Sequence, residues 1–372
     1  MTEAATAAWR AFDPAPPVAE ARTPPPSWYL DPGFLELERR SVFHRHWIPV
    51  TRAALVAAPG AVQAGVHLGR PWLVVRDEDG RLRAFHNVCR HHASPVACGG
   101  QEVRELVCPY HGWTYALDGR LKRAPRLGRV EGFEPAAHGL RPLAVEERGP
   151  LVFLGFGAGL PSLDEALGPD AAGLWAPGAE GPLRHAATRV WDLRCNWKVF
   201  IDNYLDGGYH VAGLHPDLAA GLDLEGYRTT VGASSVLQEC RARGDERLGA
   251  AARYLWVHPS WCANRYGPVL DLNLVEPLAV DRTRVVFEFF FEEGVLEDPD
   301  RGEAFVARAV AASEQVQEED VAICEAVQTG LGSPAAAPGP YAPALEAGMH
   351  RFHCLVHADI GRLFEESEAA EG

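Results

Sequence analysis

The spacing of apolar residues changes several times along the chain, and each change marks a different kind of segment. Residues 1–26 are rich in Ala and Pro and present no periodic apolar face, so we expect an N-terminal arm that lies on a surface. Asp31 followed by Pro32 is typical of a helix start. The apolar residues that follow share one helical face: Phe34, Leu35, Leu37 and Val42. We therefore predict a short helix within residues 27–46.

Residues 47–156 carry short apolar runs separated by turn signals, a pattern typical of β-structure. The clearest runs cover residues 71–76, 105–108 and 151–156. Turn pairs such as Asp79-Gly80 and Asp118-Gly119 lie between runs of this kind. The pattern predicts a small all-β domain.

Residues 157–372 open with a stretch rich in Gly and Pro and then mix helical and strand-like patterns. The plainest strand covers residues 283–293, where four side chains alternate on one face: Val285, Phe287, Phe289 and Phe291. A long helix is predicted over about residues 303–331, and the acidic residues 365–372 are expected to form a frayed end. The whole chain is therefore expected to belong to the α+β class.

Charge and composition exclude several kinds of partner. The chain has 50 acidic and 35 basic residues, and a net charge of −15 disfavours binding to nucleic acid and to anionic lipid. No apolar run reaches the roughly 18 residues of a membrane span, and residues 1–18 lack the regions of a signal peptide. We therefore expect a cytoplasmic protein without a nucleic-acid or membrane partner. Eight cysteines are too few for a disulfide scaffold here, so a cluster of them indicates a metal site.

Two short motifs in the all-β domain each offer one thiolate and one imidazole. Cys89 and His91 form the first, and Cys108 and His111 form the second. In a Rieske [2Fe–2S] cluster one iron takes two cysteines and the other takes two histidines, which suits this alternation. The alternatives are a zinc site or unrelated turn residues, although zinc fingers usually place both cysteines before both histidines.

A second group of metal ligands is predicted in the mixed domain. His210 and His215 are five residues apart, and on an uninterrupted helix their side chains diverge by about 140°. Pro216 disfavours the α conformation of His215, so we expect His215 at or beyond a helix end, from where it can turn back toward His210. Non-haem Fe(II) oxygenases bind iron with two histidines and one carboxylate. The pair therefore needs one acidic residue to complete an iron site.

Asp320, on the predicted long helix, is the best candidate for that carboxylate. Four apolar residues lie on its side of the helix: Val316, Ile323, Cys324 and Val327. A carboxylate buried there without a partner is costly, whereas one bound to a cation is not. The alternative is that Glu318, Glu319 and Asp320 are a solvated charge run. Because the helical phase singles out Asp320, we expect only Glu318 and Glu319 to lie in solvent.

These residues resemble the Rieske non-haem iron oxygenases, the family that contains the α subunits of ring-hydroxylating oxygenases. The resemblance rests on the two cluster motifs, extended to Gly112-Trp113, and on Asn196-Trp197-Lys198 leading to His210 and His215. It spans about residues 27–362. Within the family the chain is most similar to the choline monooxygenases, which oxidise choline to betaine aldehyde. The stretches that carry this second similarity are 93–94, 97–99, 202–211, 264–268 and 273–275.

The resemblance implies a domain plan and a set of cofactors. Residues 47–156 would form a Rieske domain set into a helix-grip catalytic domain of residues 157–372, on which the helix of residues 27–46 packs. Cys89, His91, Cys108 and His111 would hold the [2Fe–2S] cluster, and His210, His215 and Asp320 would hold a mononuclear Fe(II) that reacts with O2. Electrons would come from NAD(P)H through a flavin and iron–sulfur reductase. A homotrimer is also implied.

One position departs from the family pattern. Many ring-hydroxylating relatives place a bridging acid three residues before the first iron histidine, where this chain has Gly207. Asp206 stands four residues before His210, and the two glycines after it give the backbone room to bring it to that place. The alternatives are that Asp206 is an ordinary helix-terminal carboxylate, or that Asp202 takes the bridging role.

The sequence therefore predicts an O2-dependent monooxygenase that oxidises a small, choline-like quaternary ammonium or amine. Aromatic faces and carboxylates hold such a cation, although strand aromatics belong to the core more often than to a binding site. The candidate aromatic residues are Trp256, Trp261, Tyr266, Phe289 and Phe291. The rival functions are an oxygenase that hydroxylates aromatic rings and a Rieske electron carrier without catalysis, for which residues 47–156 would suffice.

Overall fold

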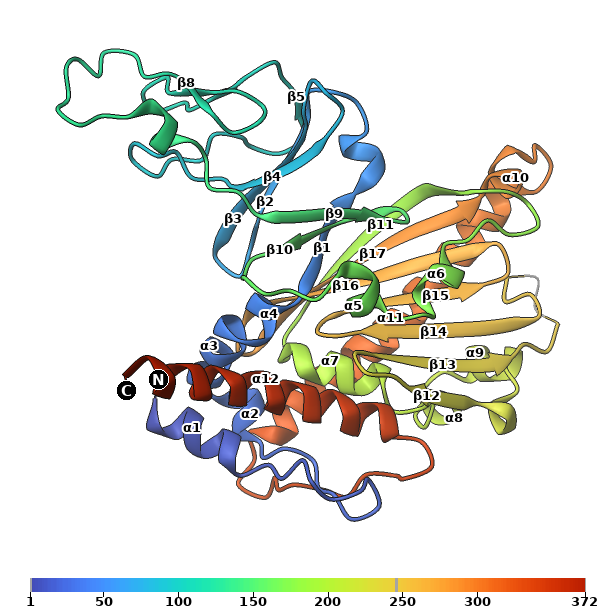
Figure 1. The fold of residues 1–372 in the computed structure, drawn as a ribbon. Helices are drawn as coiled ribbons and strands as arrows, with labels where there is room; N and C mark the ends of the chain where they lie inside the picture. The colour runs from blue at the N-terminus through green and yellow to red at the C-terminus, as the bar shows by residue number, and fades with distance from the viewer. Residues whose placement is uncertain (1, 245–246, 372) are drawn as a thin grey trace. The chain divides into compact units, whose positions relative to one another are not determined.

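The computed structural model describes residues 2–244 and 247–371 and divides them into two compact units. One unit is Trp47–Leu160, and the other combines the chain up to His46 with the chain from Pro161 onward. None of the described helices is both long and apolar enough to cross a membrane. Figure 1 shows the strands of both units and the helices of the larger one.

The smaller unit is built from three antiparallel sheets, which confirms the prediction of an all-β domain. The first sheet has the order β1-β10-β9: β1 (Trp47–Arg52), β10 (Leu151–Gly155) and β9 (Ala144–Arg148). The second has the order β4-β3-β2-β5: β4 (Leu82–His86), β3 (Arg70–Arg76), β2 (Ala61–His67) and β5 (Gln101–Glu102). The third has the order β6-β7-β8: β6 (Leu106–Val107), β7 (Thr114–Tyr115) and β8 (Leu121–Arg123).

A seven-stranded antiparallel sheet forms the centre of the larger unit. Its order is β11 (Leu183–Leu193), β17 (Arg282–Glu292), β16 (Val269–Ala279), β15 (Trp261–Tyr266), β14 (Ala251–Val257), β13 (Ser235–Arg241) and β12 (Arg228–Val231). The alternating side chains predicted at 285, 287, 289 and 291 are all buried along β17. The strand prediction for this segment is therefore confirmed.

Two helices pack on this sheet, and one of them carries Asp320. The long helix α11 (Gly302–Leu331) contacts α7 (Trp197–Tyr204) and β11, and α7 contacts β16. Shorter helices complete the unit: α5 (Leu163–Leu167), α6 (Ala171–Leu174), α8 (Val211–Leu214), α9 (Pro216–Gly221) and α10 (Glu293–Glu297). A sheet packed against one long helix is the helix-grip arrangement that the family resemblance implies (Figure 1).

The N-terminal arm predicted for residues 1–26 is partly a helix, so this prediction needs correction. Helix α1 (Glu3–Arg10) is capped by the Thr2 hydroxyl, which accepts a hydrogen bond from Ala5 N. Ala5 and Ala8 are buried, and the Ala8 carbonyl accepts a hydrogen bond from the Trp28 indole. Alanine has the highest helix propensity but gives a weak hydrophobic signal, and the face was missed for that reason.

The single helix predicted within residues 27–46 is three short helices: α2 (Ser27–Leu30), α3 (Pro32–Arg40) and α4 (Val42–Arg45). The breaks fall at Asp31, which has extended backbone angles and caps α3 through Gly33 N, and at Ser41. The expected contact with the catalytic domain exists, because Glu38 on α3 bonds to α7.

A C-terminal helix was missed, and the acidic end is not frayed where the structure describes it. Helix α12 (Ala347–Glu371) continues through the acidic residues. Its buried side chains include Phe352, Val356 and Ile360, and Glu366 pairs with Arg45 of α4. Packing and this ion pair outweigh the repulsion among the carboxylates, which only the tertiary contacts reveal.

A buried ion pair fastens α3 to α7. Lys198 Nζ lies 2.6 Å from Glu38 Oε1, and both side chains are fully buried. The Trp197 indole donates to Glu38 Oε2 and Asn196 Oδ1 accepts from Lys198 Nζ, at 2.8 Å each. Burial raises the pKa of Glu38 and lowers that of Lys198, although their mutual attraction opposes both shifts. Each charge therefore depends on the other to remain ionised.

We expect Lys198→Met to destabilise the larger unit by about 3–5 kcal/mol, because it leaves the Glu38 carboxylate buried without its cation. Thermal unfolding followed by circular dichroism measures the loss. Lys122→Met is the matched control: Lys122 is the only other lysine, and its pair with Glu105 is partly exposed and worth less than about 1 kcal/mol. Equal losses in the two variants would contradict a special role for the buried pair.

Candidate metal centres and the cavity beside one of them

The two Cys/His motifs meet in the smaller unit. Both thiols are buried, in the same apolar core as Trp113 and Tyr115. His91 Nδ1 and His111 Nδ1 face each other at 3.1 Å. The structure therefore brings together all four side chains that the sequence selected.

The loops around these ligands are held in tight turns. Cys108 N donates to the Trp113 carbonyl, and Gly112 takes a left-handed conformation with φ +72° to close that turn. The Trp113 ring stacks on His91, with ring centroids 4.9 Å apart. The Tyr115 hydroxyl lies 3.2 Å from Cys89 Sγ. Rigid, partly backbone-bonded loops of this kind fix the directions of the four side chains.

The four side chains supply the two thiols and two imidazoles that a Rieske [2Fe–2S] cluster needs as ligands. Burial, and to a smaller extent the neighbouring Cys108 thiol, raises the pKa of Cys89. A bound cluster would supply the positive charge that two buried thiolates need, and the two imidazoles facing each other at the surface would supply the remaining donors. The residues present therefore fit the cluster.

In the larger unit, the turn after α7 places His210 and His215. His210 is the residue immediately before α8, and His215 lies between α8 and α9 with φ −120° and ψ 68°. These angles are outside the α region, as the following Pro216 predicts. The two imidazole centroids are consequently only 5.0 Å apart. The expected break in the helix is confirmed.

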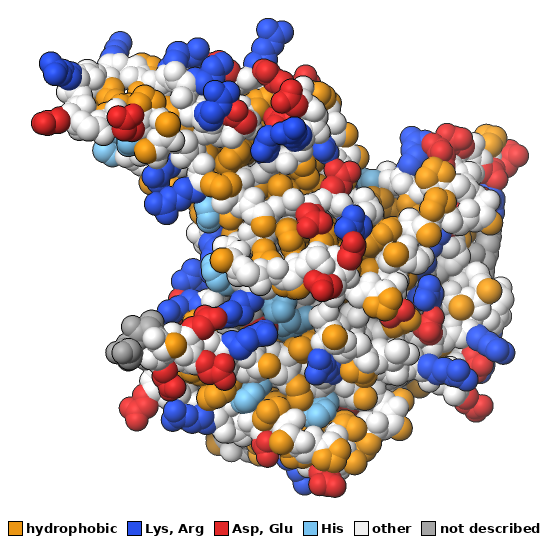
Figure 2. Space-filling view, in the orientation of Figure 1, with side chains coloured by type: hydrophobic (Ala, Val, Ile, Leu, Met, Phe, Trp, Pro, Cys, Tyr) orange, Lys and Arg blue, Asp and Glu red, His pale blue; other side chains and the backbone are white. Residues whose placement is uncertain are grey.

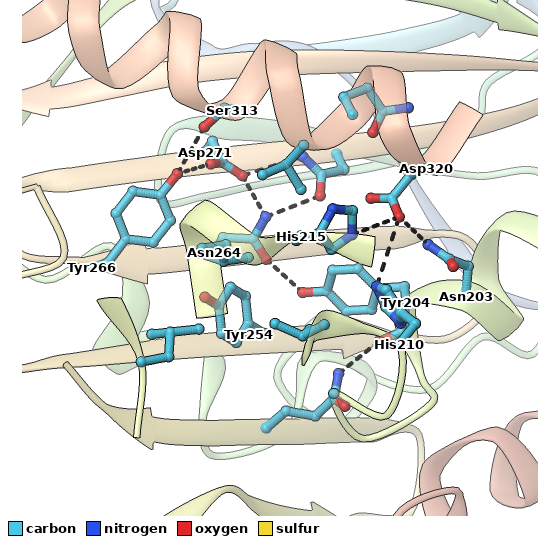
Figure 3. A pocket seen from close by; sticks show the side chains of 18 of the residues that line it. Asn203, Tyr204, His210, His215, Tyr254, Asn264, Tyr266, Asp271, Ser313 and Asp320 are labelled. Atoms are coloured by element: carbon cyan, nitrogen blue, oxygen red, sulfur yellow. Dashed lines mark hydrogen bonds and ion pairs between the residues drawn. The ribbon is translucent and has the colours of Figure 1, made fainter. Parts of the chain in front are cut away.

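Asp320 on α11 completes the group. Its Oδ1 lies 3.1 Å from His215 Nε2 and 3.7 Å from His210 Nε2. Asn203 on α7 donates a 2.7 Å hydrogen bond to the same oxygen (Figure 3). One donor atom from each of the three ligands lies within 4.8 Å of the others. Two imidazoles and one carboxylate in this arrangement fit a mononuclear divalent iron.

The face of α11 around Asp320 differs in part from the apolar stripe that the sequence predicts. Ile323 and Val327 are 39% and 44% exposed, so they do not form the buried face of α11. The buried positions around Asp320 are mostly polar: Ser313, Gln317, Cys324 and Gln328. Asp320 thus faces the interior as predicted, but its surroundings are polar and not apolar.

A second carboxylate contacts each histidine. Asp206 Oδ2 lies 2.5 Å from His210 Nδ1, and Glu319 Oε2 lies 2.5 Å from His215 Nδ1. Burial opposes protonation of His215, but its bonds to Asp320 and Glu319 outweigh burial and raise its pKa. Metal-bound histidines usually donate their second N–H in this way, which leaves both Nε2 atoms for a metal.

Glu319 corrects the expectation that both glutamates before Asp320 lie in solvent. Glu318 is exposed, but Glu319 bonds to His215. Helical phase alone could not show this, because Glu319 reaches a residue on another element. An acidic residue beside a ligand carboxylate is the signal that could have suggested it.

The Asp206 carboxylate contacts His210, which is one of the two contacts that a bridging acid between the metal centres would need. Besides His210 Nδ1, its carboxylate accepts hydrogen bonds from the backbone N–H groups of Gly208, Tyr209 and His210. Gly207 and Gly208 have φ +69° and +76°, and a Cβ at Gly207 would lie 2.2 Å from the Leu345 carbonyl oxygen. The two glycines therefore permit the turn that brings Asp206 to His210, as predicted. Asp202 instead bonds to Tyr29 and His353.

A cavity opens beside the three candidate iron ligands. Of the five aromatic residues proposed from the sequence, only Tyr266 lines it, whereas Trp256, Trp261, Phe289 and Phe291 are core residues. The aromatic residues that line it and were missed are Phe200, Tyr204, Tyr227, Tyr254 and Phe287. The strand pattern could not show which face of each strand meets the cavity.

A buried carboxylate, also missed, lines the same cavity. Asp271 on β16 is 2% exposed, and it accepts hydrogen bonds from the side chains of Tyr266, Asn264 and Asn273 (Figure 3). Burial raises the pKa of Asp271, although these donors and the nearby Arg247 oppose that shift. A polar cluster of this kind in an otherwise aromatic wall indicates a ligand-binding position.

Two family models match the chain. Residues 46–134 match the Rieske [2Fe-2S] domain, and residues 181–361 match the ring hydroxylating alpha subunit (catalytic domain). The chloroplastic choline monooxygenase of Arabidopsis thaliana is 42% identical over 94% of this chain and 85% of its own length. The glycine betaine monooxygenase oxygenase subunit of Chromohalobacter salexigens is 37% identical over 53% of this chain and 44% of its own length.

A solved structure agrees over nearly the whole chain. The quaternary ammonium Rieske monooxygenase described in connection with carnitine oxidation and inter-subunit electron transfer has a TM-score of 0.82 and 26% identity. The match covers 93% of this chain and 97% of that one. Both the two-domain plan and the cofactor types predicted from the sequence agree with these relatives.

We expect Asp320→Ala to lose the mononuclear iron and keep the [2Fe–2S] absorption spectrum, because the two sets of ligands lie in separate units. Iron and acid-labile sulfide assays measure both, with about one iron lost per chain out of three. Glu318→Ala is the matched control, since this neighbouring glutamate is exposed. Full iron content in Asp320→Ala would show that another carboxylate completes the site.

Proposed function

The chain belongs to the family of Rieske oxygenases that includes choline monooxygenase, and from this premise we propose that it is an O2-dependent monooxygenase of a small quaternary ammonium compound. The observation that carries the proposal is one cavity lined both by the His210, His215 and Asp320 group and by tyrosine rings with a buried carboxylate. A trimethylammonium group cannot accept or donate hydrogen bonds, so aromatic faces and negative charge are what can bind it.

We assign the cofactor ligands as follows. Cys89, His91, Cys108 and His111 would hold the cluster, and His210, His215 and Asp320 would hold Fe(II). When bound, the two centres supply electron relay and O2 activation, with electrons from NAD(P)H through a flavin and iron–sulfur reductase. The chain's own residues orient these ligands: Asp206 and Glu319 fix the two iron histidines, and Asn203 fixes Asp320.

We also propose a head-to-tail homotrimer in which Asp206 lies between His210 and His111 of the neighbouring subunit. The distribution of charged residues supports a contact between the smaller unit of one subunit and the larger unit of the next. Residues 47–160 contain 14 basic and 10 acidic residues, whereas the rest of the chain contains 21 basic and 40 acidic residues. Lys and Arg side chains are frequent on the visible face of the smaller unit (Figure 2). A basic unit of one subunit is therefore attracted to the acidic unit of the next.

Two rival functions fit the residues less well. An oxygenase of aromatic rings would share both metal sites, but it has no use for a carboxylate buried in the substrate cavity. An electron carrier would need only residues 47–160 and would leave the His210, His215 and Asp320 group without a purpose. The cytoplasmic location stays a prediction, which cell fractionation tests.

The function is tested with purified protein loaded with iron, a reductase and NAD(P)H. We expect three iron atoms per chain and O2-dependent oxidation of choline or a related quaternary amine, detected by mass spectrometry. An electron carrier would hold two iron atoms and yield no product. Preferential oxidation of benzoate-like aromatic acids would instead favour the ring-hydroxylating alternative.

Asp206→Asn tests the electron path between subunits. We expect both metal centres to load and the cluster to be reducible, but turnover to fall at least about 100-fold, because the amide loses the charge that holds the histidine N–H groups. Rapid-mixing spectroscopy would show slow reoxidation of the reduced cluster. Asp217→Asn, at an exposed carboxylate on α9, should turn over normally. Normal turnover in Asp206→Asn would exclude this residue from the path.

A further inference from the structure

We propose that Asp271 selects the substrate: its carboxylate binds the quaternary nitrogen and favours an amino alcohol without a carboxylate over carboxylate-bearing betaines. This inference rests on the proposed function and adds to it the class of substrate and the residue that decides it.

Helix α7 connects the two polar groups of the cavity. Asn203 donates to Asp320, and the adjacent Tyr204 donates a 2.6 Å hydrogen bond to Asn264 Oδ1. Asn264 in turn donates through Nδ2 to Asp271 (Figure 3). Consecutive residues of one helix therefore bond to the candidate iron group and to the Asp271 group. Both groups line the same cavity.

The hydrogen bonds that the Asp271 carboxylate accepts leave it suited to bind a cation that forms no hydrogen bonds. Asn264 and Asn273 donate to Oδ1, and Tyr266 donates to Oδ2. These three donors orient the carboxylate but bring no positive charge. Because a quaternary ammonium interacts through charge and not through N–H groups, it does not have to displace any of them.

A purely structural role would not require the negative charge. Burying a carboxylate is costly, and an amide of the same shape could occupy a network made of neutral side chains at lower cost. Arg247, whose guanidinium lies over the Tyr266 ring, offsets part of this cost, and a cationic ligand in the cavity would offset it further. Tyr204, Tyr254 and Tyr227 line the same cavity and offer aromatic faces to that ligand.

The charges on the cavity wall disfavour a substrate that carries a carboxylate. Asp206, Asp271 and Asp320 line the cavity, but Fe(II) would balance the charge of Asp320, and Asp206 bonds to His210. Asp271 is therefore the carboxylate whose charge would act on a ligand, and the described lining residues include one arginine, Arg247. The Arg247 guanidinium lies 5.0 Å from the centre of the Tyr266 ring, whose hydroxyl bonds to Asp271. A betaine whose ammonium group lies against Asp271 keeps its own carboxylate within the length of one small molecule from Asp271, and like charges repel more strongly in a cavity of low dielectric than in water. The rival is that Arg247 binds that carboxylate.

Three probes of similar size separate charge from shape: choline, its uncharged isostere 3,3-dimethylbutan-1-ol, and glycine betaine. Binding to the anaerobic, metal-loaded enzyme is measured by calorimetry, so the readout does not depend on turnover. For the wild type we expect choline to bind at least about 30-fold more tightly than the isostere, and about tenfold more tightly than glycine betaine.

Asp271→Asn removes the charge and keeps the size of the side chain. We expect the preference for choline over the isostere to fall at least tenfold, with little change in the affinity for the isostere. Asp271→Glu keeps the charge and should keep the preference, even if all affinities fall. Asp192→Asn is the matched control, because Asp192 pairs with Arg284 outside the cavity. Cluster absorption and thermal unfolding verify that each variant is folded.

The possible results distinguish a failure of the proposed function from a failure of the role of Asp271. If the wild type neither binds nor oxidises any quaternary ammonium compound, the proposed function fails. If wild type and Asp271→Asn prefer choline over the isostere to the same extent, Asp271 does not select the substrate, while the proposed function stands. If Asp271→Asn does not fold, loss of the preference in Asp271→Glu overturns the role. If glycine betaine binds more tightly than choline and Arg247→Gln removes that affinity, the cavity is built for betaines.

Discussion

Polar groups that are buried away from water need hydrogen-bond or ion-pair partners. Helix α7 shows how this constraint fixes the positions of the elements in the larger unit. The polar side chains of this eight-residue helix bond to at least four different elements. Lys198 pairs with Glu38 of α3, Asp202 with His353 of α12, Asn203 with Asp320 of α11, and Tyr204 with Asn264 of β15. Moving α7 would break all four contacts and leave charges buried without partners, so the helix fixes the walls of the cavity.

The same constraint explains the orientation of the iron ligands. Each histidine has two ring nitrogens, and in both cases a carboxylate bonds to Nδ1. The ring is thereby turned so that Nε2 points to Asp320. Two of the three carboxylates come from consecutive residues of one helix, Glu319 and Asp320. The geometry of the site is therefore set by contacts among α11, α7 and the turns around α8, and not by any one segment.

The cavity combines two kinds of negative group with separate tasks. Asp320 converges with two imidazoles and suits a metal, whereas the hydrogen-bond donors to Asp271 among the described residues are neutral, which suits an exchangeable cationic ligand. Tyrosine rings line the space between such groups at little cost, because each ring offers an apolar face and a hydroxyl that bonds to the wall. Tyr204 and Tyr266 both use their hydroxyls in this way.

The sequence by itself determined the ligand types and the local breaks that place them: the Cys/His motifs, the proline that turns His215 back, and the alternating strand of residues 283–293. These depend on neighbours in the chain. Tertiary structure alone decided which groups meet across elements, such as Glu319 with His215, Asp271 with Tyr266, and the acidic C-terminal residues with α4. It also decided that Trp256 and Trp261 are core residues and that α1 is a helix. Burial and cross-element pairing depend on distances that no local pattern encodes.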